Sequence, residues 1–178
     1  MTTLTKSMTS AVGVAALSLV GAGAACGVVG IRINTSKSIP PGLYRTTDLP
    51  ITTGSYVLVC PPDTLPFKHA RERGYIGAGF CPGDYGYLMK RVAATRNDAV
   101  TVSDEGVYVN DALLPMSAPR RSDQMGRPLP QYRISDYLLS HDEVLLMSDQ
   151  SDTGFDSRYF GPVLRSQLAT AMIAVLTW

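Results

Sequence analysis

The stretch between Lys6 and Arg32 contains no charged residue and is dominated by Ala, Val, Leu and Gly. A helix needs about 20 predominantly apolar residues to cross the roughly 30 Å hydrocarbon core of a bilayer. The uncharged stretch is long enough, so we expect residues 1–32 to form an N-terminal membrane anchor and residues 33–178 to form one folded domain. The orientation of this anchor in the membrane stays open, because a positive charge flanks each of its ends.

Two other interpretations of this stretch compete with the anchor. Ala22 to Ala25 are small enough for the cleavage site of a secretory signal peptide, but the apolar region of such a peptide is shorter. Cys26 would be the acylated residue of a lipoprotein, although no large aliphatic residue lies among the three before it. The uncleaved anchor is favoured, because the run is long and leads straight into the candidate active site.

The charge of the whole chain excludes one class of partner. The formal net charge is +1, with 16 Lys and Arg against 15 Asp and Glu, and no basic stripe is visible. A nucleic-acid-binding domain normally carries such a stripe. We therefore expect no nucleic-acid partner.

Short apolar segments of β-prone residues, separated by turns, make up most of the chain after the anchor. One charged helix is expected at Leu65 to Arg73, with Gly74 placed to stop it. The segments Thr35–Gly42 and Pro115–Pro130 are rich in turn residues and are expected to be loops. The domain should therefore be mainly β. The expected strands are Ile31–Asn34, Tyr56–Val59, Tyr85–Ala93, a hairpin of Val100–Val102 with Val107–Val109, Val144–Met147, and a final core strand Ala171–Trp178.

Cys60 and Cys81 bear on the compartment. In an oxidising space a disulfide between them would close a loop of about 20 residues and stabilise the fold by roughly 3 kcal/mol in the chain-entropy model. The alternative is two buried free thiols, which pack like small apolar side chains. We favour the disulfide. A zinc site is not expected, because neither histidine has ligand spacing to the cysteines.

Histidine catalysis finds little support in the sequence. His69 lies on the charged face of the expected helix, and His141 lies in a polar turn. A Ser-His-Asp triad needs a histidine beside an orienting carboxylate and a serine. Both histidines have the surroundings of surface residues.

Lys90 is the other base available to a serine, and it is the only lysine inside an apolar strand. Neighbouring strand residues point to opposite faces, so only one of Lys90 and Arg91 can face the core. Burial disfavours the charged form of a lysine, lowers its pKa and leaves it able to act as a general base. The competing interpretation is an exposed lysine on an edge strand, which discourages aggregation.

The loop that follows the first strand carries two serines, Ser36 and Ser38, ahead of Pro40-Pro41-Gly42. In extended geometry residues two apart project to the same side. One serine can then attack a carbonyl while the other donates a hydrogen bond to the developing oxyanion. By itself the loop is also compatible with an ordinary polar turn.

In combination these segments resemble the type I signal peptidases. The order is an anchor, Ser-Ile-Pro-Pro-Gly, Leu-Met-Lys-Arg-Val, and a late Phe-Asp-Ser-Arg-Tyr-Phe-Gly-Pro at Phe155 to Pro162. The family has a serine box Ser-Met-x-Pro, a lysine box Lys-Arg-Val and a late box with Asp-Ser-Arg. Gly-Leu-Tyr after the serine box and Cys81-Pro82-Gly83 are similar to its conjugative-transfer branch. In one departure, Asn97-Asp98 stands where the family has Gly-x-Pro-Gly-Asp.

The resemblance implies a role for each matched residue. Ser38 corresponds to the nucleophile, Lys90 to the general base and Ser36 to an oxyanion-hole donor. In the late box, Asp156 is also considered for catalysis, while Arg158 and Gly161 support the site. The implied fold has coiled antiparallel β-sheets behind one transmembrane helix, and no cofactor or metal is implied.

The implied function is a membrane-bound serine endopeptidase of the bacterial inner membrane, with residues 33–178 as its periplasmic catalytic domain. Its substrate would be a secreted or membrane precursor, above all a conjugative pilin subunit that is matured during plasmid transfer, either by plain cleavage or by cyclisation. Other conjugative transfer proteins are further expected partners. The alternatives are a general type I leader peptidase, a LexA-type self-cleaving repressor, which would need a DNA-binding module in place of the anchor, and a non-enzymatic component of the conjugation channel.

Overall fold

The computed structural model describes residues 30–178, so almost all of the expected anchor, residues 1–32, lies outside the described residues. Within residues 30–178 no helix is both long enough and apolar enough to span a bilayer. The strands are β1 (Ile31–Asn34), β2 (Gly42–Thr47), β3 (Tyr56–Val59), β4 (Ala78–Cys81), β5 (Leu88–Ala94), β6 (Ala99–Val102), β7 (Val107–Val109), β8 (Ala112–Leu113), β9 (Ile134–Leu138), β10 (Glu143–Met147), β11 (Val163–Leu164) and β12 (Leu168–Thr177). The helices are α2 (Leu65–Glu72) and α3 (Ser157–Phe160), with 3-10 turns η1 (Pro82–Asp84) and η2 (Arg165–Gln167).

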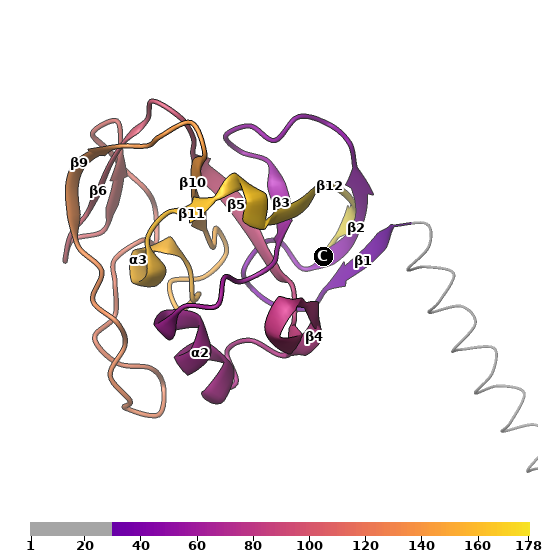
Figure 1. Ribbon diagram of the computed structural model, residues 1–178, viewed down its shortest axis with the longest axis horizontal. Helices are drawn as coiled ribbons and strands as arrows, with labels where there is room; N and C mark the ends of the chain where they lie inside the picture. The colour runs from indigo at the N-terminus through magenta and orange to yellow at the C-terminus, as the bar shows by residue number, and fades with distance from the viewer. Residues whose placement is uncertain (1–29) are drawn as a thin grey trace, which may run out of the picture.

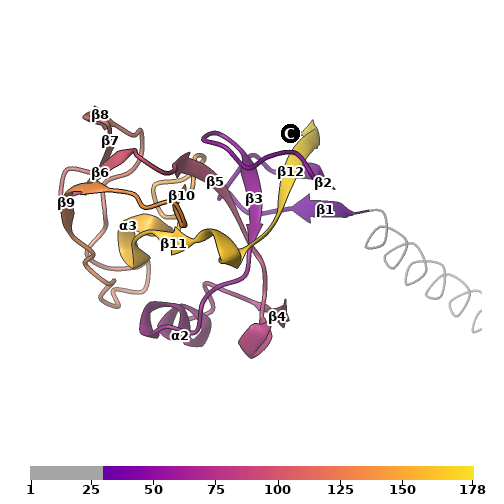
Figure 2. The ribbon, with the colours of Figure 1, turned by 45° about the horizontal axis from the view of Figure 1, so that its top comes forward.

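Two antiparallel sheets form the described domain, which confirms the mainly β prediction. The larger sheet has the order β1-β2-β12-β3-β5-β10-β11, and the smaller has the order β8-β7-β6-β9. The smaller sheet lies at the far side of the molecule from β1 and β2, and α2 lies below β10 and β11 in both views (Figures 1 and 2). Strand β5 therefore lies inside the larger sheet, between β3 and β10.

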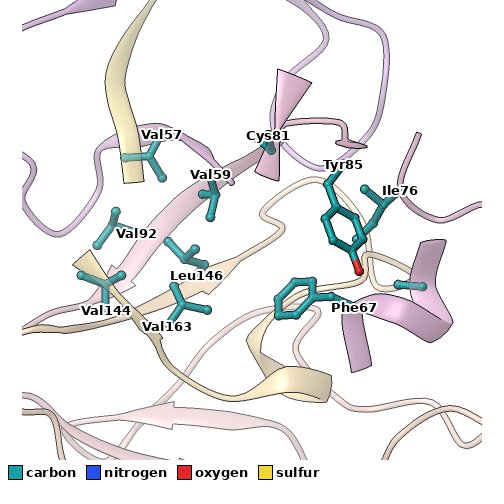
Figure 3. Packing of buried hydrophobic residues seen from close by; sticks show 11 residues of the cluster. Val57, Val59, Phe67, Ile76, Cys81, Tyr85, Val92, Val144, Leu146 and Val163 are labelled. Atoms are coloured by element: carbon teal, nitrogen blue, oxygen red, sulfur yellow. The ribbon is translucent and has the colours of Figure 1, made fainter. Parts of the chain in front are cut away.

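Apolar side chains from β3, β5 and β10 pack against α2 to form the largest buried cluster. Figure 3 shows Phe67 and Ile76 grouped around the ring of Tyr85, with the strand valines on the other side of the cluster. A second cluster fills the space under the smaller sheet. A third, small cluster joins Ile39 to Tyr44, Leu58 and Met172, and so lies directly beneath the loop that carries the two serines.

The structure corrects several of the expected element boundaries. Strand β5 begins at Leu88 and not at Tyr85, because η1 and Gly86 occupy the approach to it. Strand β12 begins earlier than expected, at Leu168, and only its middle is a core strand. Its residues Val175 and Leu176 are each 58% exposed. Strands β2 and β9 were not expected at all, whereas the hairpin of β6 and β7 is confirmed.

Candidate active site

Asn34 holds the loop that presents the two serines. Its side-chain amide donates to the carbonyl oxygens of Ser36 (2.9 Å) and Ile39 (2.8 Å), and its Oδ1 accepts from the Ser36 hydroxyl (2.8 Å). Ile39 is fully buried and fixes the next residue of the loop in the core. The Tyr44 hydroxyl donates to the carbonyl of Pro40 at 2.6 Å. These contacts hold Ser36 and Ile39 in place, and so fix the position of the half-buried Ser38 between them.

Lys90 reaches Ser38 from the middle of the larger sheet. Its Nζ donates to the Oγ of Ser38 at 3.1 Å and to the Oγ of Ser148 at 2.8 Å. The residue is only 2% exposed, whereas its neighbour Arg91 points to solvent. Strand alternation therefore places the lysine on the inner face and the arginine outside.

Burial of the Lys90 ammonium lowers its pKa from 10.5 to about 8. The guanidinium of Arg158 acts in the same direction, while the carboxylates of Asp156 and Asp149 partly oppose the shift. A lysine with such a pKa is neutral in an appreciable fraction of molecules near neutral pH. Lys90 thus has both the position and the protonation behaviour of a general base for Ser38.

Ser148, at the end of β10, was not identified from the sequence. Its hydroxyl holds Lys90, and its backbone amide donates to Oδ2 of Asp156 at 2.9 Å. Strand β10 pairs with β5 so that Met147 lies opposite Arg91, which brings the next residue beside Lys90. The sequence feature that could have identified Ser148 is its position as a polar residue directly after the buried run Val144–Met147.

Asp156 and Arg158 form an ion pair that has no solvent exposure. The guanidinium meets the carboxylate through two hydrogen bonds, Nε to Oδ1 at 2.7 Å and Nη2 to Oδ2 at 2.9 Å. Arg158 Nη1 also donates to the carbonyl oxygens of Met116 (2.8 Å) and Asp152 (3.1 Å). Asp156 reaches Lys90 only through Ser148, so the geometry gives this pair a supporting position behind the lysine.

The two candidate oxyanion donors, the Ser38 amide and the Ser36 hydroxyl, are hydrogen-bonded within the loop. The Ser38 amide donates to the Oγ of Ser36 at 3.3 Å, and the Ser36 hydroxyl donates to Oδ1 of Asn34. To form an oxyanion hole, both donors would have to turn from these partners to the carbonyl oxygen of a substrate.

The remaining candidate residues lie away from this centre. Gly161 ends α3 with a φ of +78°, and a Cβ there would lie 2.7 Å from the ring of Tyr132. His141 is exposed and contacts Asp142, and His69 lies on α2.

Cys60 and Cys81 are joined by a disulfide that ties the end of β3 to β4. Among residues 30–178 no group of three or more His, Cys, Asp or Glu residues is arranged so that it could hold a metal ion.

A cleft of about 560 Å³ opens in front of Ser38 and Lys90. Leu88, Phe155 and Tyr159 give it apolar surfaces, and residues of the segment 120–129 also line it. An apolar cleft with a few convergent polar groups at its base is the usual form of a binding site. Ser38 and Lys90 are therefore open to a ligand that enters this cleft.

Comparison with known proteins bears on the identity of the chain. A family model described as signal peptidase, peptidase S26, matches residues 1–178. Two plasmid transfer proteins TraF of Escherichia coli are 58% and 55% identical to it over 166 residues, which is 93% of this chain and 92% of each relative. A solved signal peptidase I of Enterococcus faecalis V583 aligns with 71% of this chain and 100% of its own, with a TM-score of 0.41 and 13% identity. The sequence matches extend over nearly the whole chain.

Proposed function

The chain belongs to the signal peptidase family, peptidase S26, and from this premise we propose that it is a membrane-bound serine endopeptidase with Ser38 as nucleophile and Lys90 as general base. The single observation that carries the proposal is the contact of 3.1 Å between Lys90 Nζ and Ser38 Oγ. The lysine is buried, and its pKa is lowered to about 8. Serine is a weak nucleophile unless an adjacent base takes its proton.

The proposed reaction is acyl transfer. Neutral Lys90 accepts the hydroxyl proton of Ser38 as Oγ attacks a peptide carbonyl, and the Ser38 amide and Ser36 hydroxyl stabilise the oxyanion. The ammonium of Lys90 then gives its proton to the leaving amine, which leaves an acyl-Ser38 ester. Because Ser148 accepts a hydrogen bond from Lys90, it holds the amine in line with Ser38 during both transfers.

The acyl-enzyme has two acceptors open to it. Attack by water gives a cleaved, linear product, and attack by the substrate's own amino terminus gives a cyclic peptide. The TraF relatives are named plasmid transfer proteins. We extend that context to this chain and propose a conjugative pilin precursor as the substrate, with other transfer proteins as further partners.

The proposed location is the bacterial inner membrane, with residues 1–32 as anchor and 33–178 as a periplasmic catalytic domain. The uncharged run up to Ile31 supports the anchor. The disulfide between Cys60 and Cys81 supports an oxidising compartment for the domain. The active-site loop begins immediately after β1, so Ser38 would work near the membrane surface.

The proposal is tested by co-expressing the full chain with candidate pilin precursors and measuring the intact mass of the products. Parallel labelling with a serine-reactive acyl probe, followed by peptide mapping, reports whether Ser38 is the reactive residue. We expect one probe per chain, on Ser38, and none in Ser38→Ala. A cyclic product is lighter than the linear one by one water. A wild-type protein that neither labels nor processes any precursor would favour a non-enzymatic channel component instead.

A further inference from the structure

The segment 121–129, expected to be an irregular loop, is an ordered hairpin at the edge of the catalytic cleft. Its arms are joined by hydrogen bonds from Leu129 N to Arg121 O and from Asp123 N to Arg127 O, both 2.9 Å. Gly126 turns the chain at the tip with a φ of +75°. A loop with its own hydrogen-bonded arms keeps its shape and can act as a wall.

The carboxylate of Asp123 fastens this hairpin internally. Its Oδ1 accepts from the amides of Met125 and Arg127, each at 2.9 Å, and its Oδ2 accepts from Arg127 Nε at 2.6 Å. The same Oδ2 also accepts a hydrogen bond from the hydroxyl of Tyr75, a residue of the main body of the domain. One carboxylate therefore organises the turn and ties it to the body.

Two further contacts hold the hairpin against the body beside Tyr75. Arg73 Nη1 donates to the carbonyl of Pro128 at 2.6 Å, and the guanidinium of Arg127 lies 5.6 Å from the centre of the Tyr75 ring. Three of the residues that make these ties, Tyr75, Asp123 and Arg127, also line the cleft at whose base Ser38 and Lys90 lie.

Apolar side chains of the hairpin line the cleft. Met125 is 79% exposed at the tip and, with the half-buried Leu129, belongs to the cleft wall. Methionine is flexible and polarizable, so it adapts to apolar partners of varied shape. Phe155 and Leu88 offer apolar surface elsewhere in the same cleft. A ligand that lies between the hairpin and the body of the domain would thus contact apolar side chains of both.

We propose that the hairpin 121–129 is the specificity wall of the active site, in which Met125 contacts apolar side chains of an extended polypeptide substrate and the Asp123–Tyr75 contact sets the position of the wall. This inference rests on the proposed peptidase function. It names the class of substrate segment that the site takes, an extended chain with an apolar residue at the position facing Met125. It assigns Tyr75 and Asp123 as positioning residues, because the hydrogen bond between them holds the hairpin to the body of the domain.

The test is steady-state processing of the cognate precursor by full-length Tyr75→Phe and Met125→Ser. Tyr75→Phe removes the hydroxyl that binds Asp123 but keeps the ring beneath Arg127. Tyr108→Phe is the matched control, because it also removes a tyrosine–carboxylate hydrogen bond, to Glu105 at 2.8 Å, but lies outside the cleft. We expect KM to rise about three- to tenfold in both cleft variants with kcat nearly constant, the mark of lost substrate binding, and no change in Tyr108→Phe.

Met125→Ser changes an exposed residue at the tip, so a folding defect does not account for its effect. Thermal melting reports whether Tyr75→Phe is folded as stably as the wild type. An unchanged KM in both cleft variants would overturn the inference. So would a fall in kcat at constant KM, which would indicate disturbance of the Ser38 and Lys90 centre. Acyl-probe labelling of wild-type Ser38 distinguishes a failure of the specificity wall from a failure of the peptidase function. A labelled wild type with unaffected variants refutes the wall alone, whereas an unlabelled wild type refutes the peptidase on which it rests.

Discussion

Lys90 and Arg91 are neighbouring cations on β5 with opposite environments. The lysine is buried among apolar side chains and two serine hydroxyls, while the arginine points outward near Asp149, with 3.8 Å between Arg91 Nη1 and Asp149 Oδ2. Removing an ammonium from water is unfavourable, and the two hydroxyls offset only part of that loss. The same burial that suits Lys90 for proton transfer should therefore make it a source of instability.

The two serines should differ in importance. Ser38→Ala should abolish processing, because loss of a nucleophile typically lowers the rate by up to about a million-fold. Ser36→Ala should lower kcat by about a hundred- to thousand-fold, as expected for one lost oxyanion donor. Processing of the precursor by both purified variants measures this. An inactive Ser36→Ala beside an active Ser38→Ala would show that the two roles are reversed.

Lys90 should make the stability of the domain depend on pH in a specific window. Between the folded-state pKa of about 8 and the ordinary value of 10.5, the unfolded chain keeps the Lys90 proton that the folded state has lost. The free energy of unfolding therefore rises with pH across this window, and below about pH 8 the full penalty is present. The difference in unfolding free energy between Lys90→Met and wild type should shrink by roughly 3 kcal/mol from pH 7 to pH 10.5.

Urea unfolding of both proteins across this pH range measures that difference, and Lys68→Met, at a solvent-exposed lysine, is the control. A difference that does not change with pH would mean that Lys90 keeps its ordinary protonation in the folded state.

At the scale of the elements, the sequence predicted those that carry a clear apolar pattern. The runs of β3 and β10 were recognisable. The alternation along β5 indicated that only one of Lys90 and Arg91 faces the core, but it did not decide which. Strand β2 was missed because it begins inside the Pro-Gly loop at Gly42, and β9 because four of its five residues are exposed. The role of Ser148 depends on the pairing of β10 with β5, across 58 residues of sequence, and on the register shift at Leu145. No local pattern encodes such a pairing.

The segment before α3 is closely fitted to the end of β10. A Cβ at Gly154 would lie 2.1 Å from the Ser148 Oγ and 2.5 Å from its Cβ, so a larger residue must displace the hydroxyl that holds Lys90. Gly154→Ala should therefore lower the rate of Ser38 acylation by about ten- to a hundredfold, as small misplacements of catalytic groups do. Gly77→Ala, where a Cβ meets nothing within 4 Å, is the matched control. Equal acylation rates in the two variants would contradict the fitted arrangement.

The disulfide should stabilise the elements that it joins. It links the end of β3 to β4, with a sequence separation of 21 residues between Cys60 and Cys81. In the chain-entropy model a loop of this size contributes about 3 kcal/mol. The double variant Cys60→Ser/Cys81→Ser should lose about that much in urea unfolding, and both thiols of the wild type should resist alkylation until they are reduced. Labelling of both Cys60 and Cys81 in unreduced, denatured protein would rule out the bridge.

At the scale of the whole molecule, the fold brings four distant segments to one point. The loop between β1 and β2 supplies Ser38, β5 supplies Lys90, the end of β10 supplies Ser148, and the segment before α3 supplies the carboxylate of Asp156. Three of these segments belong to or border the larger sheet, whose antiparallel order sets their spacing. The domain is thus a support that holds a lysine and a serine together at the base of one cleft.

The central claim is that neutral Lys90 activates Ser38, and the pH dependence of Ser38 acylation tests it most directly. The rate of labelling by a serine-reactive acyl probe, measured by intact mass from about pH 6 to about pH 10, should rise with a midpoint near the Lys90 pKa of about 8 and then level off. Lys90→Arg keeps the charge but cannot lose its proton at these pH values, so it should remain unlabelled throughout. Labelling of Lys90→Arg at the wild-type rate, or a wild-type rate independent of pH, would contradict the Ser38–Lys90 mechanism.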